Sequence, residues 1–345
     1  MCIKPNVSVV MPVYNAEKYL PEIMEAFAAQ TCSSFELIAV NDGSKDASGK
    51  LLDEYVQKYS FLRVIHRENG GIWRARETGI HAAKGKYIGF CDNDDLPLPG
   101  LYQRLYEAAE ENDADMSVCT YVREEMETGK ILAHEMKALA GFTIDMRIDP
   151  TAYAVVNPAP WNKLVKAEIL KQGIHFDQPP RILEDVVLNT SVCPLIKKIV
   201  CIPDMLYRYR IRRDSTITTI SKKDLPLIEA RMLEARTYAA KRAEDEKVLK
   251  MIDSMAFIHF GTSIVLRRFR GGEPVHFAVK DVGRYLESGF PYYKNPTYGL
   301  LWNMKNHFVM LKPYVALTCF KLHLLEVLLS CYRFVTEKLG IEIMW

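Results

Sequence analysis

The chain has 345 residues, of which 49% are apolar and 26% are charged, and its formal net charge is +2. This composition is ordinary for a folded globular protein, and the length predicts one large domain or two unequal ones. So small a net charge excludes a general polyanion binder, and we expect no nucleic-acid partner.

Apolar runs alternate with helically spaced segments over the first third of the chain, which predicts a mostly parallel sheet with helices on both faces. The predicted elements are a strand at 7–13, a helix at 17–30, a strand at 35–40, a helix at 46–59, a strand at 63–67, a helix at 73–83, a strand at 86–91, a helix at 100–112 and a strand at 114–122. In such sheets ligands bind outside the carboxyl ends of the strands.

Polar residues follow four of these strands, in the segments 14–15, 41–44, 69–71 and 92–95. The last segment places three carboxylates within four residues, at Asp92, Asp94 and Asp95. Such a cluster of oxygen ligands favours a hard cation, Mg²⁺ or Mn²⁺, which would offset the mutual repulsion of the carboxylates. Taken alone, the pattern is equally typical of a solvated acidic turn.

Residues 123–160 give no clear pattern, whereas the chain beyond residue 222 has helical spacing. We therefore expect a catalytic domain at 1–220 and a helical region at 221–345. The eight cysteines include no CxxC pair, which favours buried, reduced thiols. No window of about 18 residues is uncharged and apolar, and the amino terminus lacks a signal-peptide pattern. These features predict a cytoplasmic protein without a transmembrane helix.

Five segments resemble glycosyltransferase family 2, a group of inverting nucleotide-sugar transferases. They are VSVVMPVYNAEKYL (7–20), FELIAVNDGSKDAS (35–48), ENGGIWRARETGIHAAKGKYIGFCDNDD (68–95), WNKL (161–164) and LEDVVL (183–188). The resemblance implies an α/β GT-A nucleotide-diphospho-sugar transferase fold, with a Rossmann-like, mostly parallel sheet flanked by helices. It covers most of residues 7–220 and does not extend to 221–345.

The resemblance implies a nucleotide site at the first two strand ends. Pro12, Tyr14 and Asn15 match residues that grip the base and ribose, although simple packing is an alternative for Tyr14. Asp42 matches the acid that accepts a hydrogen bond from the base, which favours uracil. Asn41 stands where the family often has a second acid, and Asn-Asp-Gly-Ser is also a good turn in its own right.

The resemblance also assigns the donor and metal residues. Gly71 lets the backbone approach a ligand, and Arg76 supports the diphosphate or the aspartate cluster. Asp92 and Asp94 match the D-x-D motif, with Asp94 as the direct ligand of Mn²⁺ or Mg²⁺. Asn93, between them, replaces a common serine.

Three further features complete the implied site. In the acid pair, Asp185 would be the catalytic base and Glu184 would bind the acceptor hydroxyl or support the structure. The alternative is an acidic helix start that the helix dipole favours. Trp161 can form an apolar platform for the acceptor or belong to the core. Arg210 and Arg213 match a basic turn over the diphosphate, without a way to choose between them.

These assignments imply a metal-dependent enzyme that moves a hexosyl or N-acetylhexosaminyl group from a UDP-sugar to a glycan or lipid-linked acceptor. The family implies a role in bacterial-type cell-surface polysaccharide synthesis. Two alternatives remain: a degenerate member that binds a glycan or a partner protein, and a sugar-phosphate nucleotidyltransferase. The latter normally has a basic, glycine-rich loop after its first strand, and PVYNAEKYL is not such a loop.

Residues 290–335 are rich in aromatic and basic residues, and Glu326 is their one acid. Apolar helices with basic edges suit an anionic membrane surface, with Trp302, Tyr314 and Tyr332 as interfacial anchors. Packing on the catalytic domain or a homo-oligomer would give the same pattern, so both interpretations remain open.

Overall fold

The computed structural model describes residues 5–212 and 223–331. Two compact units divide the chain, one of Met1–Met146 and Asn157–Asp214 and the other of Arg147–Val156 and Ser215–Trp345. The division predicted near residue 220 falls among residues outside the described ranges. Sequence patterns do not predict that Arg147–Val156 joins the helical unit. Hydrogen bonds from Trp302 Nε1 to Asp149 and between Thr151 and Thr297 attach this segment there.

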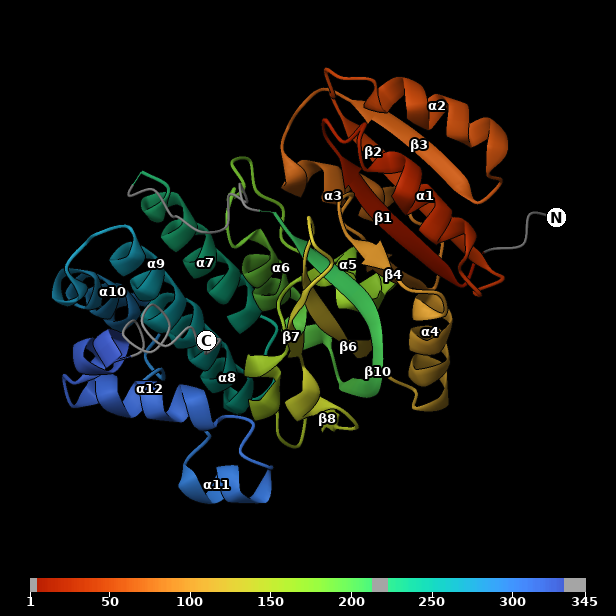
Figure 1. Cartoon of the computed structure of the whole chain (residues 1–345). Helices are drawn as coiled ribbons and strands as arrows, with labels where there is room; N and C mark the ends of the chain where they lie inside the picture. Colours follow the sequence, from red (N-terminus) through yellow and green to blue (C-terminus); the bar gives the residue numbers. More distant parts are fainter. Residues whose placement is uncertain (1–4, 213–222, 332–345) are drawn as a thin grey trace. The chain divides into compact units, whose positions relative to one another are not determined.

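The first unit is a sheet with helices on both faces (Figure 1). In chain order, its elements are β1 Val7–Val13, α1 Leu20–Ala28, β2 Phe35–Asp42, α2 Ser48–Lys58, β3 Leu62–Arg67, α3 Ile72–Ala82, β4 Tyr87–Phe90, β5 Leu96–Pro97, α4 Leu101–Glu111, β6 Met116–Glu125, β7 Ile131–Glu135, η1 Lys137–Leu139, β8 Thr143–Asp145, η3 Pro160–Asn162, β9 Lys163–Lys166, α5 Ala167–Leu170, α6 Glu184–Val192, η4 Cys193–Leu195 and β10 Lys198–Ile211. Every strand and helix predicted up to residue 122 is confirmed, with ends shifted by a few residues.

The strands lie in the order β3-β2-β1-β4-β9-β6-β10-β5, with β7 beside β6 and β8 beside β10. Strands β1 to β4 pair in parallel, as do β6 and β10. The antiparallel strand β9 separates these two parallel groups. The expected α/β fold is therefore confirmed, and the pairings that involve β5, β7, β8 and β9 make the sheet mixed.

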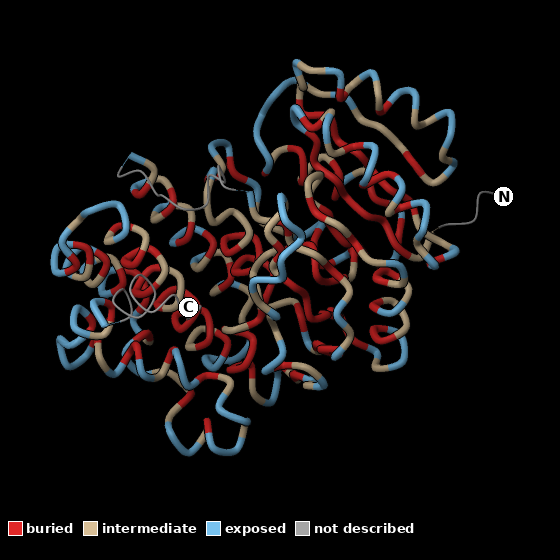
Figure 2. Tube along the Cα trace, viewed as in Figure 1, coloured by how far each residue is buried: buried red, intermediate tan, exposed pale blue. Residues whose placement is uncertain are grey.

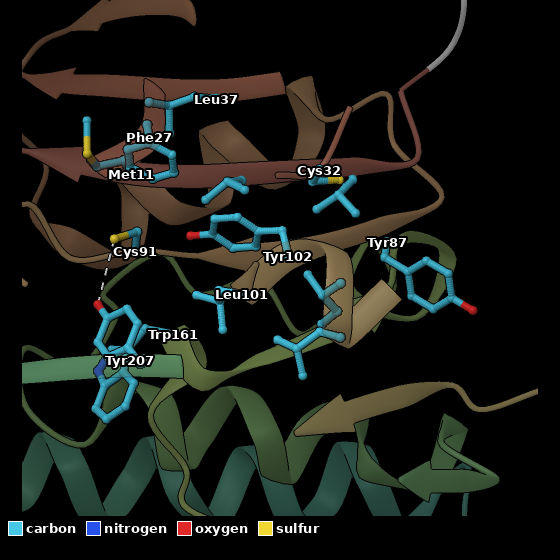
Figure 3. Close-up of a cluster of buried hydrophobic side chains, with 14 of the residues drawn as sticks. Met11, Phe27, Cys32, Leu37, Tyr87, Cys91, Leu101, Tyr102, Trp161 and Tyr207 are labelled. Atoms are coloured by element: carbon cyan, nitrogen blue, oxygen red, sulfur yellow. Dashed lines mark hydrogen bonds between the residues drawn. The ribbon is translucent and has the colours of Figure 1, made fainter. Parts of the chain in front are cut away.

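Side-chain alternation along β1 assigns the helices to the two faces of the sheet. Val7, Val9 and Met11 pack in one cluster with α1, α2 and α4, while Val10 faces the opposite side, where Gly79 brings α3 close. An added Cβ at Gly79 would lie 2.3 Å from a Val10 methyl carbon, so only glycine allows this approach. Strands β1 and β2 are buried almost throughout (Figure 2), and Figure 3 shows part of the cluster that covers β1.

The second unit is helical, as expected. Its elements are η2 Thr151–Val155, α7 Leu225–Ala240, α8 Glu246–Ala256, the π-helix η6 Phe257–Ile264, α9 Val265–Arg270, α10 Val275–Gly289, α11 Leu300–Lys305 and α12 Leu311–Lys321. A buried carboxylate, Asp253, accepts two hydrogen bonds from the Arg236 guanidinium, of 2.7 and 3.2 Å, and one from Tyr292 N. This ion pair ties α7 to α8.

The continuous helix Glu246–Arg270 differs from the expectation that no segment could span a membrane. By length and composition it is long and apolar enough to do so. However, 72% of its apolar window is buried inside the structure, and the core helix of a soluble protein passes the same test. Burial of Met251, Ile252, Phe257 and Phe260 agrees with a core helix.

Candidate active site

Parallel pairing brings three strand ends together at one edge of the sheet. Strand β1 pairs with β2 on one side and with β4 on the other. Tyr14 and Asp92 lie in the turns after β1 and β4, and Asp42 is the last residue of β2. The family resemblance assigns all three to the nucleotide-sugar site. The topology therefore gathers these residues at the edge where α/β sheets bind their ligands.

Hydrogen bonds join the turns after β1, β2 and β4. Asn15 adopts a left-handed conformation with φ of 49°, and its Oδ1 accepts from Lys45 N at 2.8 Å. Asn93 Nδ2 donates to the Pro12 carbonyl at 2.8 Å. Tyr14 is 45% exposed, so the packing alternative does not describe its ring. This ring is available at the strand ends for stacking.

Asp42 organises the turn before α3. Its carboxylate is almost fully buried and accepts from Gly71 N at 2.7 Å and from Gly70 N at 3.1 Å. Arg67 Nε lies 3.2 Å from the same carboxylate. Gly71 has a φ of 84°, which favours glycine. These contacts lie outside the Asn-Asp-Gly-Ser turn at 41–44, and the contact of Asp42 with a base stays a prediction.

The carboxylates after β4 differ in their surroundings. Asp95 is buried and accepts from Tyr207 Oη at 2.9 Å and from Arg210 N at 2.8 Å. Asp94 is partly exposed and lies 3.0 Å from Arg212. The cluster is therefore not a fully solvated turn, since β10 holds Asp95 inside the core and leaves Asp94 accessible.

Negative charge accumulates in this cluster. Burial and then the charge of Asp92 raise the pKa of Asp94 above its ordinary value. Burial, followed by the charges of Asp92 and Asp94, raises the pKa of Asp95 well above its ordinary value. Burial is the first cause of both shifts, and the repulsion between neighbouring carboxylates adds to it.

Arg76 connects the aspartate cluster to the acid pair of α6. Its buried guanidinium lies 3.2 Å from Asp92 Oδ1 and 3.0 Å from Glu184 Oε1. Although burial lowers the pKa of Arg76, the charges of Asp92, Glu184 and Asp185 raise it above its ordinary value. One guanidinium thus lies between two groups of acids and contacts both. The family resemblance assigns one group to donor binding and the other to proton transfer. Glu77, the residue directly after Arg76, pairs with Arg74 and His175 instead.

The acid pair begins α6, and Leu183 precedes it with a φ of 58°. A left-handed leucine is rare, and residues held in such conformations cluster at functional sites. Asp185 Oδ1 accepts from Val186 N at 2.8 Å. Burial lowers the pKa of Lys163 to about 7, and the nearby charge of Asp185 opposes this shift. Sequence analysis did not single out Lys163, although it lies within the WNKL motif.

Glu184 should make stability depend on pH. Burial and the charge of Asp185 raise its pKa from 4.5 to about 7. As pH rises, the unfolded chain loses this proton first, so the stabilising contribution is complete below pH 4.5 and lost above about pH 7. We expect the free energy of unfolding of the wild type to fall between about pH 4.5 and 7 relative to Glu184→Gln. Denaturant unfolding across that range checks this, and parallel curves would contradict it.

The basic turn predicted at Arg210 and Arg213 is only partly described. Arg210 is buried, donates to the Asp94 carbonyl at 2.6 Å and pairs with Glu22 at 2.6 Å, so it braces the loop from inside. Arg213 lies outside the described residues. Arg212, which the sequence did not single out, is the described arginine of this turn that reaches the Asp94 carboxylate. Its position directly before Arg213, in the same basic turn, is the sequence feature that could have indicated this contact.

Trp161 belongs to the core. Its ring therefore does not form the exposed platform for the acceptor, which was one of the two alternatives. The indole is 4% exposed and stacks with Tyr207 and Tyr209 at centroid distances of 4.5 and 5.3 Å. Tyr121 meets it edge-on. Figure 3 shows Trp161 beside Tyr207, whose hydroxyl lies 3.7 Å from Cys91 Sγ. Trp161 therefore supports β10, and Tyr207, on which it stacks, donates to Asp95 in the carboxylate loop.

A cavity of about 1030 Å³ lies elsewhere, at the amino ends of β1, β2 and β4. Pro5, Phe35 and Gly85 line it, together with five basic residues. Lys86, Lys166 and Arg63 are already paired with Glu110, Asp115 and Glu36. This cavity is therefore not the candidate site.

Among the described residues, no group of three or more His, Cys, Asp or Glu forms a ready-made metal site. Asp92 and Asp94 nevertheless have the donor chemistry that Mg²⁺ and Mn²⁺ prefer. Mg²⁺ is often held by one or two carboxylates plus substrate phosphate oxygens, which two aspartates and a diphosphate would supply. The excess negative charge at Asp94 and Asp95 fits such a cation.

This sheet, with acids at its strand ends and an acid pair joined to them by Arg76, is that of a glycosyltransferase of the GT-A fold. S. aureus TarS 1–349, solved in complex with UDP, has a similar structure with a TM-score of 0.68. The match covers 95% of this chain and 91% of that one at 18% identity, so it shows the fold. The mannosyltransferase PcManGT from Pyrobaculum calidifontis, in complex with GDP-Man and Mn²⁺, matches at 13% identity with a TM-score of 0.53 over 93% of this chain and 88% of that one.

The chain belongs to glycosyl transferase family 2. The model of that family matches residues 8–173. Glycosyltransferase GlyG of Streptococcus pneumoniae is 33% identical over 229 residues, which are 62% of this chain and 73% of GlyG. The protein described as uncharacterized glycosyltransferase EpsJ of Bacillus subtilis is 32% identical over 223 residues, which span 64% of each chain.

Proposed function

We propose that the protein moves a hexosyl or N-acetylhexosaminyl group from a UDP-sugar to a glycan or lipid-linked acceptor, with inversion at the anomeric carbon. The observation that carries the proposal is the Arg76 bridge, because it ties the aspartates assigned to donor binding to the acids assigned to proton transfer. UDP is the nucleotide named in the complexes of the structurally similar TarS.

The donor nucleotide would bind at the ends of β1 and β2. Exposed Tyr14 would stack on the base, and the turn that Asn15 and Asp42 stabilise would hold base and ribose. Gly71, at the start of α3, would let the diphosphate approach the backbone. Arg212 would contact the diphosphate, because it is partly exposed and already lies beside Asp94.

Asp92 and Asp94 would hold Mn²⁺ or Mg²⁺, and Asn93 keeps their loop against Pro12. When bound, the cation would supply Lewis-acid stabilisation of the departing nucleoside diphosphate. Mn²⁺ is named in the complex of the distantly similar PcManGT. The excess negative charge around Asp94 supports a cation at this position.

In the proposed reaction the acceptor hydroxyl gives its proton to the Asp185 carboxylate as its oxygen forms a bond to the anomeric carbon. The bond from that carbon to the diphosphate oxygen breaks, and the diphosphate leaves with the electron pair. Attack opposite the leaving group inverts the configuration. Arg76 would hold Glu184 and Asp92 so that the acceptor and donor sides remain aligned.

We place this activity in bacterial-type cell-surface polysaccharide synthesis, on the cytoplasmic side of the membrane. Among the relatives are a minor teichoic acid biosynthesis protein, GgaB, and a poly(ribitol-phosphate) beta-glucosyltransferase. The matched regions span only 23% and 33% of those two proteins. We therefore do not assign their acceptors to this chain. No nucleic-acid partner is expected, and a homo-oligomer remains compatible with the proposal.

Nucleotide release from a panel of UDP-, GDP- and CMP-sugars, with Mn²⁺ or Mg²⁺, tests the proposal. We expect release of UDP from one UDP-sugar and calorimetric binding of UDP to the same preparation. A sugar-phosphate nucleotidyltransferase would instead release pyrophosphate from UTP and a sugar phosphate. Absence of UDP binding and of release from every UDP-sugar would contradict the proposal and leave the binding-protein alternative.

A further inference from the structure

Large apolar side chains are exposed along α11, the turn after it and one side of α12. This α11–α12 face consists of Leu300, Leu301, Met304, Phe308, Leu311 and Val315, each at least 38% exposed. Leu301 reaches 77%. Two pairs, Leu300 with Met304 and Leu311 with Val315, have the four-residue spacing of one helix face.

The exposure belongs to one side of a packed helix. Pro313, Ala316, Leu317 and Phe320, on the other side of α12, are buried in the helical unit. Phe320 packs edge-on against Phe257 of η6 at 5.5 Å. Packing within this unit therefore explains the apolar residues on one side of α12. The α11–α12 face, on the other side, stays exposed.

The anchors expected from the sequence are not the exposed residues. Trp302 is half-buried, and its Nε1 donates to Asp149 Oδ2 at 2.7 Å. Tyr314 is also half-buried, and Tyr332 lies outside the described residues. Aliphatic side chains on α11 and α12 provide the exposed apolar area instead.

Basic residues accompany this face, and the acids next to it, Asp149 and Glu287, are already bonded to Trp302 and Lys294. Lys305, Lys312 and Lys321 are exposed on or directly after the same elements, and residues 290–325 contain no Asp or Glu. Lys321 also lines a cavity of about 330 Å³ with Lys294 and Tyr298, and no acid lines that cavity. A partner for this surface must therefore combine an apolar layer with negative charge.

We propose that the α11–α12 face docks the protein on an anionic membrane surface. Its aliphatic side chains enter the headgroup region, while the lysines lie beside acidic lipids. A second copy of the chain fits less well, because a symmetric contact through this face would set lysines against lysines. The proposal concerns the helical unit alone and goes beyond the proposed transfer reaction.

Co-sedimentation of the full chain with vesicles tests this docking. We expect binding to phosphatidylcholine vesicles that contain phosphatidylglycerol, little binding to phosphatidylcholine alone, and weaker binding at high salt, because charge is screened over about 10 Å at 0.1 M. Leu301→Glu should weaken partitioning about tenfold or more, and Lys305→Glu about fivefold. The matched controls Ile131→Glu, on an exposed strand of the first unit, and Lys50→Glu, on α2, should bind like the wild type.

Light scattering on the same samples tests the other possible partner of this face, a second copy of the chain. If Leu301→Glu leaves vesicle binding unchanged but converts an oligomer into a monomer, the face is an interface between copies and the membrane proposal is wrong. Wild-type protein that ignores anionic vesicles also overturns it. UDP binding, measured in parallel, should be equal in the wild type and Leu301→Glu, so a failure of the transfer proposal would be seen separately.

Discussion

Asp185→Asn should reduce sugar transfer by on the order of 10²–10⁴, because the amide cannot take the proton of the acceptor hydroxyl. Its Oδ1 can still accept from Val186 N, so the start of α6 should remain intact. The affinity for UDP should barely change, since the contact between the acid pair and the aspartate cluster runs through Glu184 and Arg76. The measurements are kcat at saturating donor and the Kd of UDP from calorimetry.

Glu184→Gln is the matched control within the acid pair. It removes one charge from the Arg76 bridge but leaves the Asp185 carboxylate in place. We expect the smaller loss in kcat for this variant, together with the altered pH dependence of stability described above. An inactive Glu184→Gln beside a nearly normal Asp185→Asn would assign the base to Glu184 and contradict the proposed roles.

Asp94→Asn should have the other large effect, with transfer reduced by more than about 10²-fold, because a Lewis-acid site contributes several kcal/mol to transition-state stability. The fold should survive. Burial and Asp92 raise the pKa of Asp94, so its negative charge destabilises the folded state and its removal should leave Tm unchanged or raise it. Initial rates with Mn²⁺ or Mg²⁺ and a thermal melt of the same preparation measure both consequences.

A chelator provides the complementary arm of this experiment. Excess chelator should abolish wild-type transfer, and added Mn²⁺ or Mg²⁺ should restore it. Asp177→Asn, which changes a fully exposed carboxylate outside the aspartate cluster, should retain wild-type rates. Full wild-type activity in excess chelator would exclude the metal-dependent mechanism, even if Asp94→Asn were inactive for another reason.

Local sequence patterns predicted the elements of the first unit up to residue 122 and the edge of the sheet where its candidate site lies. Strands β1, β2 and β4 are continuous apolar runs, which only burial on both faces explains. Their parallel alternation with helices then determines which end carries the ligand residues. The acids after β4 and at the start of α6 are visible in the sequence, and it was the family resemblance rather than their pattern alone that assigned them to a site.

Tertiary packing alone decided which residues act together. Arg76 and Glu184 are 108 positions apart, and no local pattern indicates that one guanidinium joins Glu184 to Asp92. The same holds for Arg212 beside Asp94, for the burial of Trp161 against β6 and β10, and for the exposure of Leu301 rather than Trp302. Periodicity reports how a residue relates to its own helix or strand. Long-range contacts and exposure depend instead on which elements pack together, and in this chain antiparallel β9 and the returning segment Arg147–Val156 determine that packing.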